Sequence, residues 1–206
     1  MLARLGETEA ASALLAQIAA RQGEALEWTE LEPRRLVCEG NMMLARDPRG
    51  AASRYEAAVQ LARATGDQAS VGVALENVGV AAMHEGALDA AERPLLDALA
   101  VFREAGDERN EARVLAKLGG VHLARRDSRR ACEPLEDALA LFRHLGDARG
   151  EARARAELAR AYLEMGDPEK AKDDAEGAMA IAHEIGDEDT AKDARALLDE
   201  ARRVLG

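Results

Sequence analysis

The chain repeats itself at an interval of forty residues. The stretch ALAVFREAGD at 98–107 returns as ALALFRHLGD at 138–147. The closing Gly-Asp pair also ends two further stretches of similar sequence, so that its glycines stand at 66, 106, 146 and 186. A fixed period of this length is typical of stacked supersecondary units, each of which contacts only its neighbours. The sequence therefore predicts a solenoid whose core grows lengthwise, rather than one or two globular domains.

Composition favours helices as the building material of this solenoid. Apolar residues make up 48% of the 206 residues, but only 2% are aromatic. The core must then consist mainly of alanine, leucine and valine, which suit closely approaching helices. The formal net charge of -11 opposes binding to nucleic acid and to anionic lipid, since both require a basic surface. We expect neither nucleic acid nor a membrane among the partners.

Several classes of site have no support in the sequence. Cys38 and Cys132 lie far apart without a CxxC motif, and the four histidines share no metal-ligand spacing, so we expect no metal and no other cofactor. A Gly-rich phosphate loop, a nucleophile elbow and a clustered acid-base set are also missing from the sequence. Residues 1–24 lack the unbroken apolar segment of a signal peptide or membrane span. We therefore expect a soluble, cytoplasmic, non-catalytic protein.

Each forty-residue repeat has the pattern of two helices. In the repeat at 67–106, apolar residues recur at helical spacing in both halves. These residues are Val71, Ala74, Leu75, Val78 and Ala82, then Leu88, Ala91, Leu95, Ala98 and Phe102. The glycine of the Gly-Asp pair can adopt the left-handed conformation that ends a helix, and the aspartate can cap the next helix. The pair therefore predicts a hinge between helices. Asp47-Pro48 and Asp167-Pro168 predict similar capping inside the hairpins.

Small residues recur where the paired helices would cross. The first helices carry Gly79, Gly119 and Ala159, and the second helices carry Ala91, Ala131 and Ala171, each set at forty-residue spacing. A larger side chain at these points would push the two axes apart, because packed helices lie about 8 to 10 Å from each other. The small residues therefore predict close contact within each hairpin.

Together these positions resemble the tetratricopeptide repeat. The residues that carry the resemblance are Val78-Gly79, Leu118-Gly119, Tyr162, Gly166-Asp167, Ala171 and Ala178. The repeat length of forty resembles the extended variety found in kinesin light chains, in Pins-type polarity adaptors and in bacterial regulators. The resemblance implies an all-α fold, a right-handed superhelical solenoid of antiparallel helical hairpins. It also implies that the inner wall, built mainly from first helices, binds extended peptides or helical segments.

The register predicts how the chain is divided. We expect four repeats within 27–187, namely 27–66, 67–106, 107–146 and 147–186, followed by a C-terminal capping helix at 188–206. Asp199 supports the cap, because it occupies the place of Gly119 and would oppose a tightly packed partner helix. The first repeat aligns only if its inter-helix turn is one residue shorter or if Gly40 slips by one. Residues 1–26 predict a helix that is either half a repeat of a longer array or an N-terminal cap.

Polar residues at inward positions of the first helices form the candidate binding site. By the repeat register these residues are Asn41, Asn77, Arg113, Lys117, Arg153 and Arg160. Arg113 and Lys117 are four residues apart and hence lie on one helical face. Some relatives clamp a terminal carboxylate with paired cations and asparagines, although Val37 stands here where the first lysine of that clamp should be. The alternative is that these side chains are ordinary solvated charges.

The functional prediction follows from this wall. We expect a protein-protein interaction scaffold that binds a peptide or protein with an acidic segment or a C-terminal carboxylate. The asparagine amides would hold the peptide backbone, and Arg113 and Lys117 would neutralise the carboxylate. A second hypothesis, implied by the resemblance, is a regulatory or sensor arm of a larger bacterial signalling protein or transcriptional regulator. Homo-oligomer formation is left open, because an uncovered terminal hairpin would expose apolar surface that another copy could bury.

Overall fold

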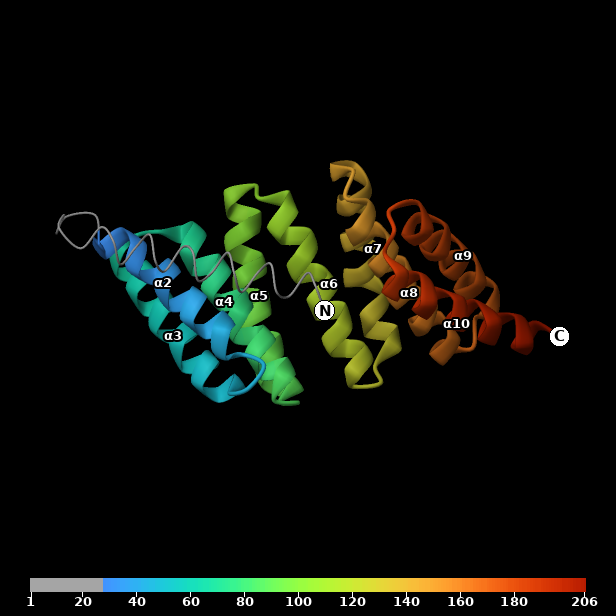
Figure 1. Ribbon diagram of the computed structural model, residues 1–206, viewed down its shortest axis with the longest axis horizontal. Helices are drawn as coiled ribbons and strands as arrows, with labels where there is room; N and C mark the ends of the chain where they lie inside the picture. The colour runs from blue at the N-terminus through green and yellow to red at the C-terminus, as the bar shows by residue number, and fades with distance from the viewer. Residues whose placement is uncertain (1–27) are drawn as a thin grey trace. The chain divides into compact units, whose positions relative to one another are not determined.

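The computed structural model describes residues 28–206, which form helices joined by short turns (Figure 1). The helices are α2 (Trp28–Met43), α3 (Pro48–Thr65), α4 (Gln68–His84), α5 (Leu88–Ala105), α6 (Glu108–Ala124), α7 (Ser128–Leu145), α8 (Ala148–Met165), α9 (Pro168–Glu184) and α10 (Glu188–Leu205). The prediction of an all-α fold is confirmed for these residues. The helix expected at 1–26 lies outside the described residues.

The chain forms two compact units, which divide between Ala105 and Gly106. In the first unit α2 packs against α3 and α4 against α5, and α3 joins the two hairpins by packing against α4. In the second unit α6 packs against α7, α8 against α9, and α10 against both α9 and α8. The helices α6 and α8 also contact each other directly. Each unit is therefore a stack of helical hairpins with its own core.

The Gly-Asp hinge has the predicted geometry. Gly66 ends α3 in the left-handed conformation with φ of 75°, and the Asp67 N–H donates to the Ala62 carbonyl at 2.9 Å. The Asp67 carboxylate then accepts from the Ser70 N–H at 3.0 Å, which caps α4. Each such cap contributes roughly 0.5 to 2 kcal/mol to helix stability. The hinge is thus confirmed as a C-cap followed directly by an N-cap.

Close helix packing at the small residues is also confirmed. A Cβ added to Gly79 would lie 2.6 Å from Leu95 Cγ, and one added to Gly119 would lie 2.4 Å from Leu135 Cγ. Both distances are far below a van der Waals contact. The alanines at the three equivalent positions of the second helices are fully buried, namely Ala91, Ala131 and Ala171. Small residues therefore allow the two helices of each hairpin to approach.

The first hairpin differs from the others at its turn. A Cβ on Gly40 would lie 2.4 Å from Tyr55 Cε1, and Tyr55 stands forty residues before Leu95. Gly40 therefore faces its partner helix as Gly79 does. Seven positions separate Gly40 from the N-cap Asp47, whereas eight separate Gly119 from the N-cap Asp127. The non-helical segment between the helices is nevertheless longer in this hairpin, 44–47 against 85–87 in the next, so the turn itself is not shortened and it is Gly40 that lies one position out of the forty-residue register.

The last helix buries one face and exposes the other. Leu197 and Leu198 of α10 are buried, while Asp199 is exposed. The exposed carboxylate is compatible with a terminal cap, which stays a prediction. No helix within residues 28–206 has both the length and the apolar character needed to cross a bilayer.

Candidate functional site

The six predicted site residues are divided between the two units. Asn41 and Asn77 belong to the first unit, on α2 and α4. The Tyr55 hydroxyl donates to Asn41 Oδ1 at 2.7 Å, and Asn77 Nδ2 donates to the Val73 carbonyl of its own helix at 2.9 Å. Each of these amides therefore makes a hydrogen bond inside its unit.

The four predicted cations belong to the second unit, with Arg113 and Lys117 on α6 and Arg153 and Arg160 on α8. The three arginines are exposed and Lys117 is half-buried. Arg113 Nη1 donates to Asn110 Oδ1 at 2.8 Å. Arg153 Nη2 lies 3.6 Å from Asp187 Oδ2, the carboxylate that caps α10. The two first helices of this unit thus carry an exposed basic surface.

Three of these cations gather around Glu157, a residue that the sequence did not indicate. Glu157 lies on α8, one turn from Arg153 and from Arg160. The side chain is partly exposed, but its Oε2 atom is buried and has no hydrogen-bond partner. Burial raises the pKa of Glu157 to about 7, against the opposing charges of Arg160, Lys117 and Arg153. The basic surface therefore has a carboxyl group at its centre that is only partly ionised at neutral pH.

An open hollow of about 430 Å³ lies beside this carboxyl group, between α6 and α8. We call it the α6–α8 hollow. Its lining residues are Gly120, Leu123, Ala124, Arg126, Glu157, Arg160 and Glu164. The α6 residues among them, Gly120, Leu123 and Ala124, are small or apolar. The hollow therefore combines a largely apolar α6 side with charged groups from α8 and from the turn after α6.

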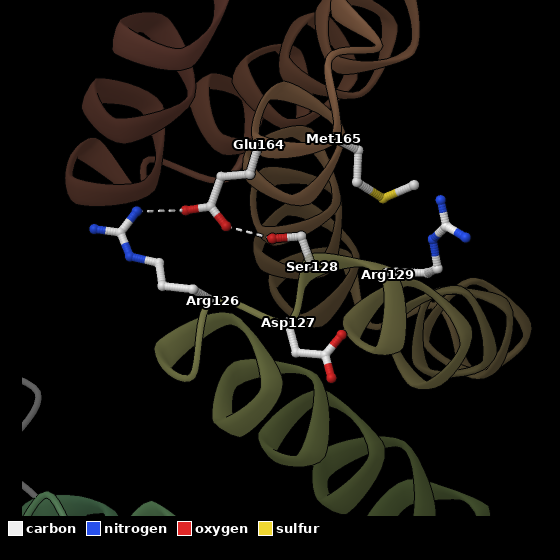
Figure 2. Close-up of a pocket in the computed structure, with 6 residues that line it drawn as sticks. All are labelled: Arg126, Asp127, Ser128, Arg129, Glu164 and Met165. Atoms are coloured by element: carbon white, nitrogen blue, oxygen red, sulfur yellow. Dashed lines mark hydrogen bonds and ion pairs between the residues drawn. The ribbon is translucent and has the colours of Figure 1, made fainter.

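A second hollow, of about 420 Å³, opens where the α6–α7 turn meets the end of α8 (Figure 2). Its lining comprises Arg126, Asp127, Ser128, Arg129, Glu164 and Met165. Arg126 Nη1 lies 3.0 Å from Glu164 Oε1, and the Ser128 hydroxyl donates to Glu164 Oε2 (Figure 2). Arg126 and Glu164 line both hollows, so the two hollows adjoin at this ion pair.

Arg126 adopts an unusual backbone conformation. Its φ of 61° is left-handed, and among residues 28–206 it is the one non-glycine residue with positive φ. The equivalent turns of the neighbouring hairpins have Gly86 with φ of 73° and Gly166 with φ of 77°. A side chain other than glycine costs about 1 to 2 kcal/mol in this conformation. The chain therefore holds an arginine at a turn where glycine is the favourable residue.

The repeat register contains a signal for both residues that the prediction missed. Glu157 stands forty residues after Lys117, which itself stands forty after Asn77, so it occupies an inward position already chosen in two repeats. Arg126 stands midway between Gly86 and Gly166 in the same way. A comparison of every register position across the repeats would have marked both. The described residues contain no group of three or more potential metal ligands.

No family model matches the sequence, and the curated proteins contain no significant match. Solved structures resemble the fold closely. BtubC (BKLC) from P. vanneervenii matches with a TM-score of 0.71 at 19% identity, over 98% of this chain and 91% of that one. A STAND ATPase with a tetratricopeptide repeat sensor from Pyrococcus horikoshii matches with 0.75 at 17% identity, over 96% of this chain and 32% of that one.

A third similar structure is the Rap conjugation gene regulator of the plasmid pLS20 in complex with the Phr* peptide. Its TM-score is 0.69 at 18% identity, and the match covers 99% of this chain and 58% of that one. This chain therefore spans about a third of the STAND protein and somewhat over half of the Rap regulator. The structural similarity shows that the fold is an all-α helical repeat of the tetratricopeptide type, which confirms the resemblance seen in the sequence.

Proposed function

We propose that this chain is a non-catalytic protein-interaction module whose second unit binds an acidic peptide segment on the face formed by α6 and α8. The observation that carries the proposal is the gathering of Lys117, Arg153 and Arg160 around Glu157, which lines the α6–α8 hollow together with Arg160. Arginine side chains bind carboxylates with two parallel hydrogen bonds, and the apolar α6 side offers contact to aliphatic groups of a peptide. Arg113 continues the basic surface along α6.

Charge distribution supports an acidic partner. The chain has a formal net charge of -11, yet three arginines on this face are exposed. A basic surface on an acidic body orients an acidic segment as it approaches, since the rest of the protein repels it. Arg153 Nη2 lies 3.6 Å from Asp187 Oδ2, and the side chains of the two residues are 61% and 9% exposed. Arg149 Nε lies 3.7 Å from the same oxygen, so Asp187 keeps a cationic partner when Arg153 binds a ligand carboxylate.

The Rap structure supports binding of a peptide in particular. That structure holds the Phr* peptide in complex with the regulator, and the match covers 99% of this chain. The proposal takes from this likeness only the ligand class, a peptide. Roles for Asn41 and Asn77 remain predictions, and binding at the second unit does not depend on them.

Fluorescence anisotropy with labelled peptides tests the proposal. A peptide rich in Asp and Glu is titrated with the wild-type chain and with the double variant Lys117→Glu, Arg160→Glu. We expect at least tenfold weaker binding by the variant, because two attractions become repulsions. The matched control is Lys192→Glu, Arg195→Glu, which makes the same charge change at exposed positions of α10. Equal affinities of wild type and the first variant would refute the assignment of this face.

A second candidate function is a regulatory or sensor arm of a larger protein. The match to the STAND ATPase covers 96% of this chain but 32% of that protein, which joins a tetratricopeptide repeat sensor to other domains. The Rap regulator is also longer than the matched region. Reading the parent gene beyond both ends tests this function. An adjoining nucleotide-binding or DNA-binding domain would favour it, whereas a free-standing gene would favour the scaffold.

Self-association is a further prediction with one supporting observation. Val204 and Leu205 at the end of α10 are 64% and 40% exposed. A second copy that covered this end would bury apolar surface. Analytical ultracentrifugation over a range of concentrations tests this, and a concentration-independent monomer would exclude it.

A further inference from the structure

We infer that the α6–α8 hollow is a subsite for one carboxyl group of the partner, and that Glu157 binds this group through a shared proton. The inference rests on the proposed function, because it names the group that this face recognises. The inference adds Glu157 as a specificity-determining residue, a carboxyl group that lies among the cations of this face.

The first argument is the unsatisfied oxygen. Glu157 Oε2 is buried, has no hydrogen-bond partner, and belongs to a side chain that lines the hollow. Most buried polar atoms in proteins are paired, and an unpaired one is unfavourable. A ligand group in the hollow supplies the missing hydrogen bond once the Glu157 side chain turns its Oε2 atom, buried in the unbound chain, toward it.

The second argument is the charge around the hollow. Arg160 and Arg153 of α8 and Lys117 of α6 act on the Glu157 carboxyl, and Arg126 of the α6–α7 turn lines the same hollow. Glu164 is the further carboxylate in the lining, and it is paired with Arg126. On α10 the position forty residues after Glu157 is Leu197, which is buried and carries no charge. Cations therefore outnumber carboxylates here, which favours an anionic ligand group.

The third argument decides how a carboxylate can lie beside Glu157. Two ionised carboxylates at hydrogen-bond distance repel each other, whereas one proton shared between them removes the repulsion. Glu157 is already held partly in its neutral form by burial. Its neutral form can donate one hydrogen bond from Oε2 to an oxygen of the ligand. When Glu157 starts ionised, the complex takes up this proton from solvent.

A different ligand group would have the opposite dependence on pH. An amide or ammonium group would donate to the ionised form of Glu157 and would therefore bind more tightly as pH rises. A carboxylate that needs the proton binds more tightly as pH falls. The sign of the pH dependence therefore separates the two kinds of ligand.

The test measures the affinity of the full chain for an acidic peptide and for its Gln-substituted counterpart at constant ionic strength. Between about pH 6 and about pH 8 the neutral fraction of a group that titrates near 7 falls roughly tenfold. We expect the affinity for the acidic peptide to fall by up to about this factor. The Gln-substituted peptide should not lose affinity over this range, because its amides can donate to the ionised form of Glu157. The variant Glu157→Gln, which carries a permanent donor, should bind the acidic peptide equally at both pH values.

The Glu157→Gln variant also controls for histidines. His122, which is buried on α6, is retained in the variant. A pH dependence that persisted in Glu157→Gln would overturn the inference. A second measurement needs no variant: calorimetric titration of the wild type in buffers of different ionisation enthalpy should show uptake of nearly one proton per peptide at about pH 8.

The outcomes distinguish this inference from the proposed function. Binding of the acidic peptide that is independent of pH, or tighter at about pH 8, would overturn the shared proton and leave the basic face intact. Zero proton uptake would do the same. If the acidic peptide does not bind at either pH, both the inference and the proposed function fail.

Discussion

Arg126 Nη1 lies 3.0 Å from Glu164 Oε1, and this contact joins the turn after α6 to the end of α8 (Figure 2). The arginine side chain is 83% exposed, so the ion pair itself contributes little to stability. The backbone strain at Arg126 is the larger effect and is destabilising, because φ of 61° is unfavourable for any residue with a Cβ atom. The contact is therefore held at a turn that would be more stable with glycine.

Replacing Arg126 tests this balance. Arg126→Gly and Arg126→Ala both remove the ion pair, but only glycine relieves the left-handed strain. We expect the glycine variant to have a free energy of unfolding about 1 kcal/mol higher than the alanine variant. Urea unfolding followed by circular dichroism measures both. Equal values would mean that the left-handed turn does not persist in solution.

The close approach of paired helices predicts that alanine substitution changes stability differently at Gly119 and at Gly177. In Gly119→Ala the new Cβ meets Leu135 at 2.4 Å, so we expect the free energy of unfolding to fall by about 1 to 3 kcal/mol. Gly177→Ala is the matched control, since its Cβ approaches only the long side chain of Arg155, at 3.2 Å. Alanine should there be neutral or stabilising by up to about 1 kcal/mol through helix propensity. A similar loss in both variants would contradict the packing argument.

The cap of α10 predicts an acid-dependent stability. Asp187 Oδ1 accepts from the Thr190 N–H at 3.3 Å, and Oδ2 lies 3.6 Å from Arg153 Nη2 and 3.7 Å from Arg149 Nε. Burial acts to raise the pKa of Asp187, but the Thr190 hydrogen bonds and the two arginines together hold this pKa below its usual value. The ionised cap therefore stabilises the fold at neutral pH, and this stabilisation is lost as pH falls below about 4.

The variant Asp187→Asn measures that contribution. Asparagine keeps a capping oxygen and removes the charge, so we expect it to be less stable than wild type by roughly 0.5 to 1 kcal/mol at neutral pH. The difference should disappear at about pH 3. Urea unfolding at both pH values provides the comparison. A difference that is equally large in acid would show that the charge is not what matters.

For Glu157 we expect the opposite dependence of stability on pH from that of Asp187. Its folded-state pKa of about 7 lies above the usual value for glutamate, so the folded chain binds the proton more strongly than the unfolded chain. Stability should then fall as pH rises from about 4.5 through about 7. We expect Glu157→Gln to match wild type at about pH 5 and to exceed it at about pH 8 by on the order of 1 to 3 kcal/mol.

The control for this prediction is Glu133→Gln, at an exposed position of α7. It makes the same chemical change at a solvated position, so we expect it to change stability equally at both pH values. Thermal unfolding in matched buffers is sufficient for the comparison. A Glu157→Gln variant that followed Glu133→Gln would show that Glu157 is well solvated.

Features that repeat locally were predictable in detail. The hinge at Gly66 and Asp67 follows from two neighbouring residues whose preferences for helix ends are strong and independent of the rest of the chain. The contacts of Gly79 and Gly119 follow from one position that recurs with the period of the hairpin. Such signals add up across repeats, so the type and ends of most helices could be foreseen.

The surroundings of the candidate site were not predictable in this way. The register placed Lys117, Arg153 and Arg160 on the first helices, but not around Glu157. The hydrogen bond of Asn41 was equally unpredictable, since its partner Tyr55 lies on the next helix. These outcomes depend on which side chains face each other across helices, and a pattern along one helix does not contain that information.

The sequence by itself determined the all-α class, the helical hairpins and the hinges between them, because caps, helical periodicity and small residues act over a few neighbouring positions. Only the tertiary structure decided that Glu157 has a buried oxygen among three cations and that Arg126 holds a left-handed turn beside Glu164. The physical reason is that burial and charge proximity arise between helices, once α6 and α8 are packed together.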